Sequence, residues 1–319
     1  MNENGDPNDE YGFYVRENLS YSDIFFKEFG YHPNEYVYRD GTLQPGLIQP
    51  EIKDALAFWK MMYDKGYINP NLFTNKSSDW RAGIKQGKAG IWMHDVSNYQ
   101  EDWAPELFVN EKNVNIGMLE GPQGPKGKGL GTEGDSIAGV WVIPTTNKNP
   151  EEAIKYLDWA WSSPEAEKFF AYGIEGVNHT VEADGTIKFD NTSPVNADNN
   201  ASVFFSVTMN PLGDGRLTPL GLASDPNGEL LIKGLEAAKN SLYKSDGLYM
   251  PSLESTKTKP ELGTFGSGTL FMDMFAKVVT GRADIDSSFD NFVKEWKKRG
   301  GDEIIKEATE WYKSFHKIQ

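Results

Sequence analysis

The stretch WVIPTTNKNPEEAIKYLDWAWSSPEAEKFFAYGIEGVNHT, residues 141–180, does most to decide the fold of this chain. It begins at the end of an apolar run, residues 137–143, which predicts a buried strand. Asn149 then provides a helix cap, followed by proline at the first helical position and two acids in the first turn. A second helix is expected to start after Ser163 and to end near Gly173. This order of strand and helices is typical of an α/β protein.

Working outward, the same signals predict helices and strands along the rest of the chain. Apolar residues at helical spacing in residues 50–65 would form one buried stripe, and Gly66 would end that helix. Further helices are expected over residues 79–86, 229–243, 269–280, 287–299 and 302–316, and further strands over residues 89–93, 115–119 and 186–189. The helix after Asn149 is expected to bury Ala153, Tyr156, Leu157 and Ala160. Tryptophans on the predicted helices are interpreted as packing residues: Trp59, Trp80, Trp159, Trp161, Trp296 and Trp311.

The bulk composition narrows the possible functions. The 319 residues are enough for two domains, and 38% hydrophobic with 13% aromatic residues can form ordinary cores. The net charge of −15 repels phosphate backbones and anionic membrane surfaces, which argues against nucleic acid as a partner. The chain has no cysteine, so disulfides, thiolate metal sites and a cysteine nucleophile are impossible. No apolar run reaches the length of about 18 residues that a membrane span needs, and the polar start MNENGDPNDE is not a signal peptide.

Five phrases occur in one order and carry a family resemblance. They are NGDPNDEYGF (residues 4–13), MYDKGYINPNLF (62–73), GKAGIWMHD (87–95), the stretch quoted first, and the ending SSFDNFVKEWKKRGGDEIIKEATEWYKSFHKIQ (287–319). Together they resemble family 1 of the extracellular solute-binding proteins, in particular the ABC-transporter carbohydrate-binding lipoproteins of Gram-positive bacteria. The resemblance implies an α/β, periplasmic-binding-protein-like type II fold with two lobes around a cleft. In that family the first phrase lies well inside the chain, so we expect a C-terminal fragment whose first lobe is incomplete.

The resemblance also suggests how the chain is organised. Residues 1–120 would be the rest of the first lobe leading into the second, and residues 121–190 would be the second lobe with hinge-like loops. Residues 191–319 would form a helix-rich region packing across both lobes. Two loop-like stretches interrupt the pattern, because residues 120–134 are rich in glycine and residues 191–200 are rich in Asn and Asp. Both are open to two interpretations, as hinge crossings or cleft rims, or as plain surface loops.

The residues expected to bind ligand lie on loops that leave strands. Sugar recognition needs flat apolar faces against the ring and polar groups for the hydroxyls. The loop after residues 89–93 resembles one that lines the ligand cleft in the family, and it supplies His94, Asp95, Asn98, Tyr99 and Trp103. The resemblance adds Asp135, Ser136, Glu175 and Phe265. A cap, turn or other structural role stays open for the first three of these added residues. A catalytic pair of His94 and Asp95 is not favoured, since adjacent residues of an extended chain point to opposite faces.

The first phrase partly matches a calcium-binding loop. Some relatives hold calcium in a shortened loop there, and by that resemblance the candidate ligands are Asn2, Asn4, Asp6, Asp9 and Glu10. In an EF-hand count the last position would fall on Tyr11, which cannot supply the bidentate carboxylate, and the first would precede Met1. A polar turn is the alternative, and no cofactor is required for the expected function.

The resemblance implies that the chain binds an oligosaccharide, or its uronic form, and delivers it to the permease subunits of an ABC importer. Ligand contacts to both lobes would shift the population toward a closed form, without covalent chemistry. The expected location is the extracellular face of the cell membrane, with a lipid anchor on the part of the protein that precedes this chain. Local basic residues would decide whether a uronate is accepted, and Arg81, Lys126 and Arg216 are candidates.

Two other functions are kept as alternatives. A carbohydrate-active enzyme of the glycoside hydrolase kind would need two carboxylates placed across a glycosidic bond, and composition alone does not exclude such a pair. No Walker A, HExxH or Gly-x-Ser-x-Gly motif is present, however, so we expect no enzyme. The second alternative is a sugar-sensing receptor domain without a transport role.

Overall fold

The computed structural model describes residues 10–109, 114–132, 142–190, 193–197, 222–223 and 227–318. The chain divides into two compact units. Unit 1 comprises Met1–His94, Glu101–Ala138 and Ala237–Gln319, and unit 2 comprises Asp95–Gln100 and Gly139–Glu236. Both segments of unit 2 are therefore inserted into the sequence of unit 1. The division predicted at residues 120 and 190 stays a prediction about the lobes of the family.

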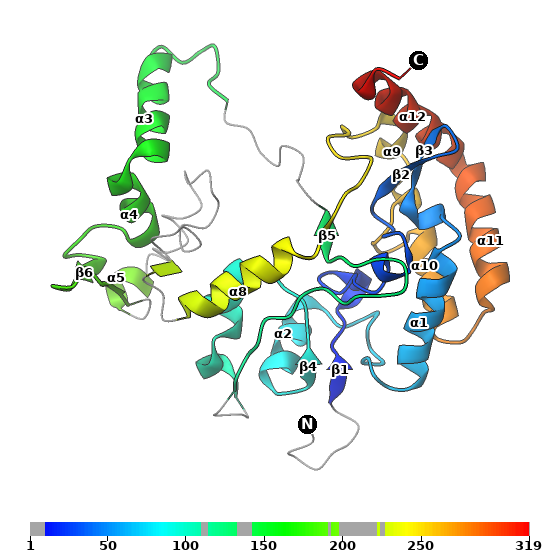
Figure 1. Ribbon diagram of the computed structural model, residues 1–319, viewed down its shortest axis with the longest axis horizontal. Helices are drawn as coiled ribbons and strands as arrows, with labels where there is room; N and C mark the ends of the chain where they lie inside the picture. The colour runs from blue at the N-terminus through cyan, green and yellow to red at the C-terminus, as the bar shows by residue number, and fades with distance from the viewer. Residues whose placement is uncertain are drawn as a thin grey trace. The chain divides into compact units, whose positions relative to one another are not determined.

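Unit 1 contains helices that share one core. Helices α1 (Ile52–Asp64), α10 (Leu270–Val279) and α11 (Ile285–Trp296) contact one another, as Figure 1 shows. The predicted stripe of α1 is confirmed, because Ile52, Leu56 and Trp59 are buried. The largest fully buried side chains of the core include Phe26, Trp59, Phe271, Phe275 and Trp296.

The ends of these helices follow the cap chemistry of the sequence. The Thr269 side chain accepts a hydrogen bond from the Met272 amide at 3.2 Å, which starts α10. Helix α12 (Asp302–His316) has the bounds that the sequence predicts. A π turn, Lys297–Gly301, replaces the predicted end of α11. Shorter helices of unit 1 are α2 (Ser77–Lys85) and α9 (Glu254–Lys257).

The strands of unit 1 form two-stranded pairs. Strand β1 (Tyr11–Phe13) runs parallel to β4 (Ala89–Ile91), with Tyr11 opposite Ala89, and β5 (Gly131–Thr132) runs parallel to β8 (Leu242–Tyr243). Strands β2 (Tyr36–Arg39) and β3 (Thr42–Pro45) form an antiparallel hairpin, on which α12 packs. The hairpin turns at Asp40 and Gly41, both with positive φ, as a two-residue I′ turn requires.

The glycine-rich loop, residues 121–131, packs closely on two other parts of unit 1. The Lys126 amide donates to the Glu28 carbonyl at 2.9 Å, and the Leu130 amide donates to the Ser241 carbonyl at 2.7 Å. A Cβ at Gly124 would lie 2.5 Å from the Glu28 carbonyl oxygen, and one at Gly127 would overlap the Lys27 carbonyl oxygen. Glycine is needed at these points because the loop backbone touches the turn Lys27–Phe29 directly.

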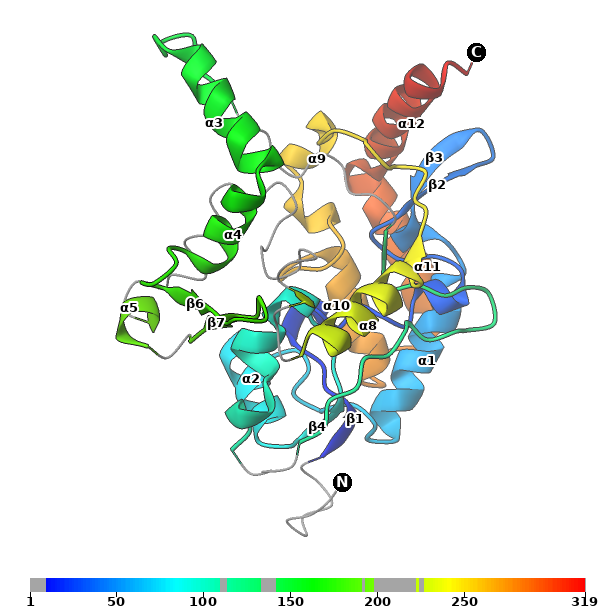
Figure 2. The same cartoon turned by 60° about the vertical axis from the view of Figure 1, so that its left-hand side comes forward.

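Unit 2 contains α3 (Pro150–Ser162), α4 (Pro164–Tyr172) and the hairpin of β6 (His179–Val181) and β7 (Ile187–Phe189), which follow one another in Figure 2. The predicted start of α4 is confirmed, since the Ser163 hydroxyl accepts from the Ala166 amide at 3.3 Å. Two further helices are α5 (Pro194–Ala197) and α8 (Gly228–Lys239), the second of which ends in unit 1.

Several predictions about elements were wrong. The segment 229–243 is not one helix, because α8 ends at Lys239 and Leu242–Tyr243 form a strand. Residues 115–119 form no strand in the described chain. On α3, Tyr156, Trp159 and Trp161 are exposed by 46%, 37% and 45%, so they are not buried as helical spacing suggested, although the Trp159 ring contacts those of Phe169 and Phe170. Most of the predicted strand at residues 137–143 lies outside the described residues.

Candidate functional site

Five aromatic side chains of unit 1 gather where β4 ends. We call them the aromatic site: Tyr21, Trp80, Trp92, His94 and Trp103. The His94 ring centroid lies 4.3 Å from that of Tyr21, 5.6 Å from that of Trp80 and 5.4 Å from that of Trp103. The Trp92 and Trp103 centroids are also 5.4 Å apart. The cluster is therefore continuous from Tyr21 through His94 to Trp92.

Burial divides the aromatic site into a base and a face. Trp80 is fully buried and Trp103 is 3% exposed, so these two rings form the base. Tyr21, Trp92 and His94 are only half-buried. A ligand that bound here would contact this second group, while the two buried tryptophans would hold the face in place. The prediction that Trp80 packs is confirmed.

The base is held by the backbone that it packs against. The Trp80 indole N–H donates to the Tyr14 carbonyl at 2.9 Å, and the Tyr14 amide donates to the Ile91 carbonyl at 3.0 Å. These two hydrogen bonds connect α2 to the chain after β1 and to the end of β4. A Cβ at Gly83 would overlap the Tyr14 hydroxyl, so α2 needs glycine where it meets that ring. The backbone at the end of β4, where the loop carrying His94 begins, is therefore held in place by these hydrogen bonds.

The segment that carries Tyr21 has an uncommon backbone. Asn18, Leu19 and Tyr21 have φ values of 54°, 55° and 50°, in the left-handed region that non-glycine residues rarely adopt. Each such residue typically costs on the order of 1–3 kcal/mol and persists only where the surrounding structure enforces it. Strain of this kind gathers at functional sites, and here it places Tyr21 against His94.

Cationic side chains border the aromatic site. The Arg16 Cζ lies 5.9 Å from the Tyr21 ring centroid, and the Lys85 Nζ lies 6.0 Å from a ring centroid of Trp103. Arg81, which follows Trp80 on α2, pairs with Asp102, its Nη2 lying 3.2 Å from Oδ2. Two donors of these side chains, Arg16 Nε and Arg81 Nε, are buried without a hydrogen-bond partner, and so is the indole N–H of Trp103.

The structure brings together only part of the predicted ligand site. His94 and Trp103 lie in the aromatic site, the second as part of its base. In unit 2, Asp95 is exposed, Asn98 is half-buried and Tyr99 is buried. Asp135 and Ser136 lie outside the described residues. The roles of these residues in binding stay predictions.

Glu175 and Phe265 have partners within their own units. Glu175 is exposed and accepts a hydrogen bond from Lys168 Nζ at 2.6 Å. That hydrogen bond is the largest cause that lowers the pKa of Glu175. The Phe265 ring packs in the core of unit 1, with centroids 5.8–5.9 Å from those of Phe26, His32 and Phe271.

Three residues of the aromatic site and its border escaped the sequence analysis. Tyr21 and Arg16 belong to a segment with no recognisable motif, and Trp92 was counted as part of a strand. They approach His94 because β1 pairs with β4, a contact between distant parts of the sequence. The phrase GKAGIWMHD, which contains Trp92 and His94, was the available signal.

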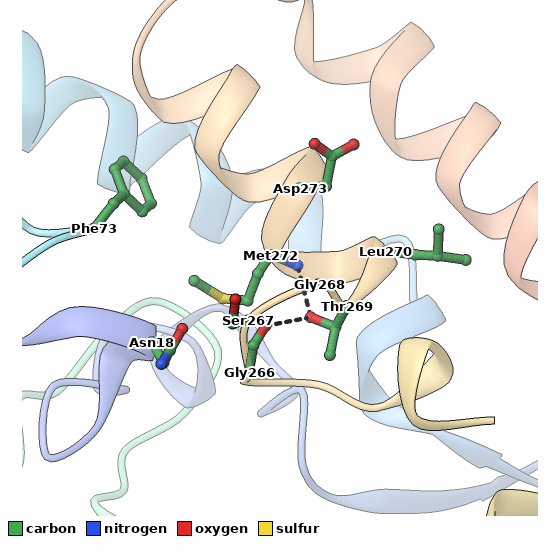
Figure 3. A pocket seen from close by; sticks show the side chains of 9 residues that line it. All are labelled: Asn18, Phe73, Gly266, Ser267, Gly268, Thr269, Leu270, Met272 and Asp273. Carbon is green, nitrogen blue, oxygen red and sulfur yellow. Dashed lines mark hydrogen bonds between the residues drawn. The ribbon is translucent and has the colours of Figure 1, made fainter. Parts of the chain in front are cut away.

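A pocket of about 450 Å³ lies at the N-terminal end of α10, also in unit 1 (Figure 3). Asn18, Phe73 and the loop at Gly266 line it, and none of the five aromatic-site residues does. Among its polar groups, the Thr269 hydroxyl caps the helix, and Asn18, Ser267 and the Asp273 carboxylate also line the pocket. The aromatic site, where several rings meet, is therefore the candidate that we consider for a ligand.

The calcium prediction can be examined only at Glu10. Glu10 is half-buried and its Oε2 is buried without a hydrogen-bond partner, which suits a calcium ligand. The other candidate ligands, Asn2, Asn4, Asp6 and Asp9, lie outside the described residues. Within the described ranges, no three His, Asp or Glu side chains are grouped so that they could hold a metal ion. No helix in the described part of the chain has the length and apolar character of a membrane span.

A sequence profile described as bacterial extracellular solute-binding protein matches residues 9–167. Over these residues the chain is similar to this family, as the sequence phrases predict. Lipoprotein LipO of Bacillus subtilis (strain 168) is 26% identical to it over 301 residues, which cover 88% of the chain and 55% of LipO. The chain thus spans little more than half the length of this relative. The match confirms the predicted family, whose members are extracellular binding proteins.

Solved structures of solute-binding proteins share the fold. The alginate-binding protein AlgQ2, in a structure without calcium ion, has a TM-score of 0.57 at 19% identity, over 98% of this chain and 65% of that chain. FusA is an ABC-transporter substrate-binding protein of S. pneumoniae, solved in complex with kestose. It has a TM-score of 0.57 at 17% identity, over 100% of this chain and 65% of the FusA chain. The predicted α/β, periplasmic-binding-protein-like type II fold class is confirmed.

Proposed function

We propose that this solute-binding protein binds an oligosaccharide at the aromatic site and delivers it to the permease of an ABC importer. The observation that carries the proposal is the half-exposed face of Tyr21, Trp92 and His94 on a buried tryptophan base. Flat rings suit the apolar face of a sugar, and Tyr and Trp add a polar tip for its hydroxyls. The similar proteins named for alginate and kestose support a carbohydrate as the ligand class.

The proposed function is binding without chemistry. The family and the similar structures are binding proteins, which supports a carrier over a glycoside hydrolase. Likeness to a lipoprotein supports a lipid anchor and a place at the extracellular face of the membrane. Capture by closure of two lobes, delivery to permease subunits and calcium binding at residues 2–10 stay predictions, and the proposed function requires no cofactor.

The first test is a thermal melt of the full chain with a panel of oligosaccharides. A ligand at a hundred times its dissociation constant should raise the free energy of unfolding by roughly 2.7 kcal/mol, which is visible as a higher melting temperature. A sugar-specific rise with no change in the sugar after incubation supports a binding protein. Release of shorter sugars would instead support an enzyme, and no response to any panel member would contradict the proposal.

The Trp92→Ala variant tests the place of binding. Removing this half-exposed ring should weaken oligosaccharide binding about tenfold, or about 1.4 kcal/mol, because the sugar loses one stacking partner. Isothermal titration calorimetry measures the change. The matched control is Trp311→Ala, which removes a half-buried tryptophan of α12 outside the aromatic site and should leave the affinity unchanged. Equal effects of both variants would place the site elsewhere.

A further inference from the structure

Arg16 has an unusual position in this acidic chain. It is half-buried, its Nε is buried without a hydrogen-bond partner, and no carboxylate of the described chain pairs with it. The net charge of −15 shows that carboxylates are plentiful elsewhere. Arg39 and Arg81, by comparison, pair with Glu51 and Asp102. A half-buried guanidinium without an acceptor is a site where an anionic group can bind with little competition.

The backbone around Arg16 is fixed from both sides. Val15, just before it, donates to Asn69 Oδ1 at 2.7 Å and accepts from Asn69 Nδ2 at 3.0 Å, and Asn69 is fully buried. The Arg16 amide itself donates to the Ser22 hydroxyl at 3.0 Å. The Tyr21 ring lies under the guanidinium at a distance typical of a cation–π contact. Arg16 is therefore held next to the face on which we place the sugar.

The other charges around the aromatic site add to the same effect. Arg81 and Lys85 are cations at its border, and Asp102 neutralises only one of them. Arg81 Nε and the Trp103 indole N–H are further buried donors without acceptors. In buried or half-buried surroundings an unpaired donor needs an acceptor oxygen, from solvent or from a ligand. These two donors are buried and lie behind the face, so the positive charge that a ligand would meet comes from Arg16 and Lys85.

We propose that the aromatic site takes a sugar that carries a carboxylate, a uronate, and that Arg16 binds this carboxylate. The planar guanidinium can donate two parallel hydrogen bonds to the two oxygens of a carboxylate, while the sugar ring rests on Tyr21 and His94. This inference rests on the proposed function and names the class of oligosaccharide. It assigns specificity to a residue that no motif marks.

The decisive experiment compares two forms of one ligand on the unchanged protein. Trigalacturonate and its methyl ester share the same skeleton, but the ester has no charge. Isothermal titration calorimetry at fixed ionic strength should show that the acid binds about 10-fold to 100-fold more tightly than the ester. Equal affinities would overturn the uronate proposal while leaving oligosaccharide binding intact. If trigalacturonate, its methyl ester and trimannuronate all fail to bind, both the uronate proposal and the proposed location of the site are overturned.

Variants then assign the selectivity to Arg16. Arg16→Gln should weaken binding of trigalacturonate to the level of the ester and leave the affinity for the ester unchanged. Arg16→Lys should fall between, because lysine keeps the charge but loses the paired geometry. Arg39→Gln, in the same unit but paired with Glu51, is the matched control and should have no effect. If Arg16→Gln weakens acid and ester equally, the residue is structural and the proposal fails. A sulfated trisaccharide that binds more tightly than the uronate would also overturn it.

Discussion

Glu28 is a buried carboxylate that the proposed function does not use. It is 3% exposed, and neither of its oxygens has a hydrogen-bond partner in the described structure. Burial raises its pKa from 4.5 to about 7, and the backbone amide of Glu28, His32 and the backbone amide of Phe25 act in the opposite direction. The folded chain holds the proton between about pH 4.5 and pH 7, where the unfolded chain has lost it.

The Glu28→Gln variant should remove this pH dependence. Because the folded pKa is raised, the wild type loses stability as the pH rises through this range, and the full cost of about 3 kcal/mol is present above pH 7. Relative to the wild type, Glu28→Gln should gain about that amount between pH 4 and pH 8, measured by urea unfolding. Glu310→Gln, an exposed carboxylate on α12, corrects for the lost charge. A gain no larger than that of Glu310→Gln would show that Glu28 is ionised without cost.

Single residues also show what sequence could reveal about the site. His94 and Trp103 were predicted to bind ligand because they lie on a loop after a recognisable strand, a common position for binding residues, and both lie in the aromatic site. Arg16 and Tyr21 were not found, because their positions depend on a left-handed backbone and on the pairing of β1 with β4. Neither the left-handed backbone nor the strand pairing can be predicted from the residues next to Arg16 and Tyr21.

Among the elements, the glycine-rich loop has the most specific requirement. Its backbone passes so close to the turn Lys27–Phe29 that a methyl group at Gly127 would overlap a carbonyl oxygen. Gly127→Ala should therefore lower the free energy of unfolding by about 1–3 kcal/mol, as overpacking does. Gly131→Ala is the matched control, since a Cβ there has open space. Similar urea midpoints for both variants would mean that the loop can move away without cost.

Two helix starts set by cap residues are as predicted, whereas the Asn149 side chain accepts no helix amide, α2 begins at Ser77 instead of after Asp79, and elements that depend on distant partners were missed. The start of α4 at Ser163 and that of α10 at Thr269 follow from cap chemistry that acts within a few residues. The end of α8 was missed, because Leu242 and Tyr243 leave the helical pattern to pair with β5. The exposed aromatics of α3 show that helical spacing identifies a face but not what covers it.

At the scale of the whole molecule, we predict that unit 1 unfolds as one cooperative body. The Trp59 ring contacts those of Phe25, Phe26 and Phe275, so it links α1 to α10. Trp59→Ala should cost about 3–5 kcal/mol and speed amide hydrogen exchange in α1, α10 and α11 together. Exchange in α3 and α4 should not change, because they have their own packing around Ala160, Ala166 and Phe170.

The matched variant for this prediction is Trp161→Ala, in α3. Trp161 is 45% exposed, so its loss should leave exchange in α1 and α10 unchanged. Faster exchange in both units after Trp59→Ala would contradict two separately cooperative bodies. The family phrases predicted the fold class at this scale, whereas the insertion of unit 2 into unit 1 could not be seen, because contacts and not composition define it.

The inserted position of unit 2 has a consequence for synthesis on the ribosome. Helix α1 leaves the ribosome about 200 residues before α10, its main packing partner. At a translation rate of about 5–20 residues per second, its apolar stripe would wait roughly 10–40 s for that partner. Unit 2 is translated entirely within this interval and can fold first. Unit 1 is thus begun first and completed last, and its N-terminal segment is the part that a chaperone would need to protect.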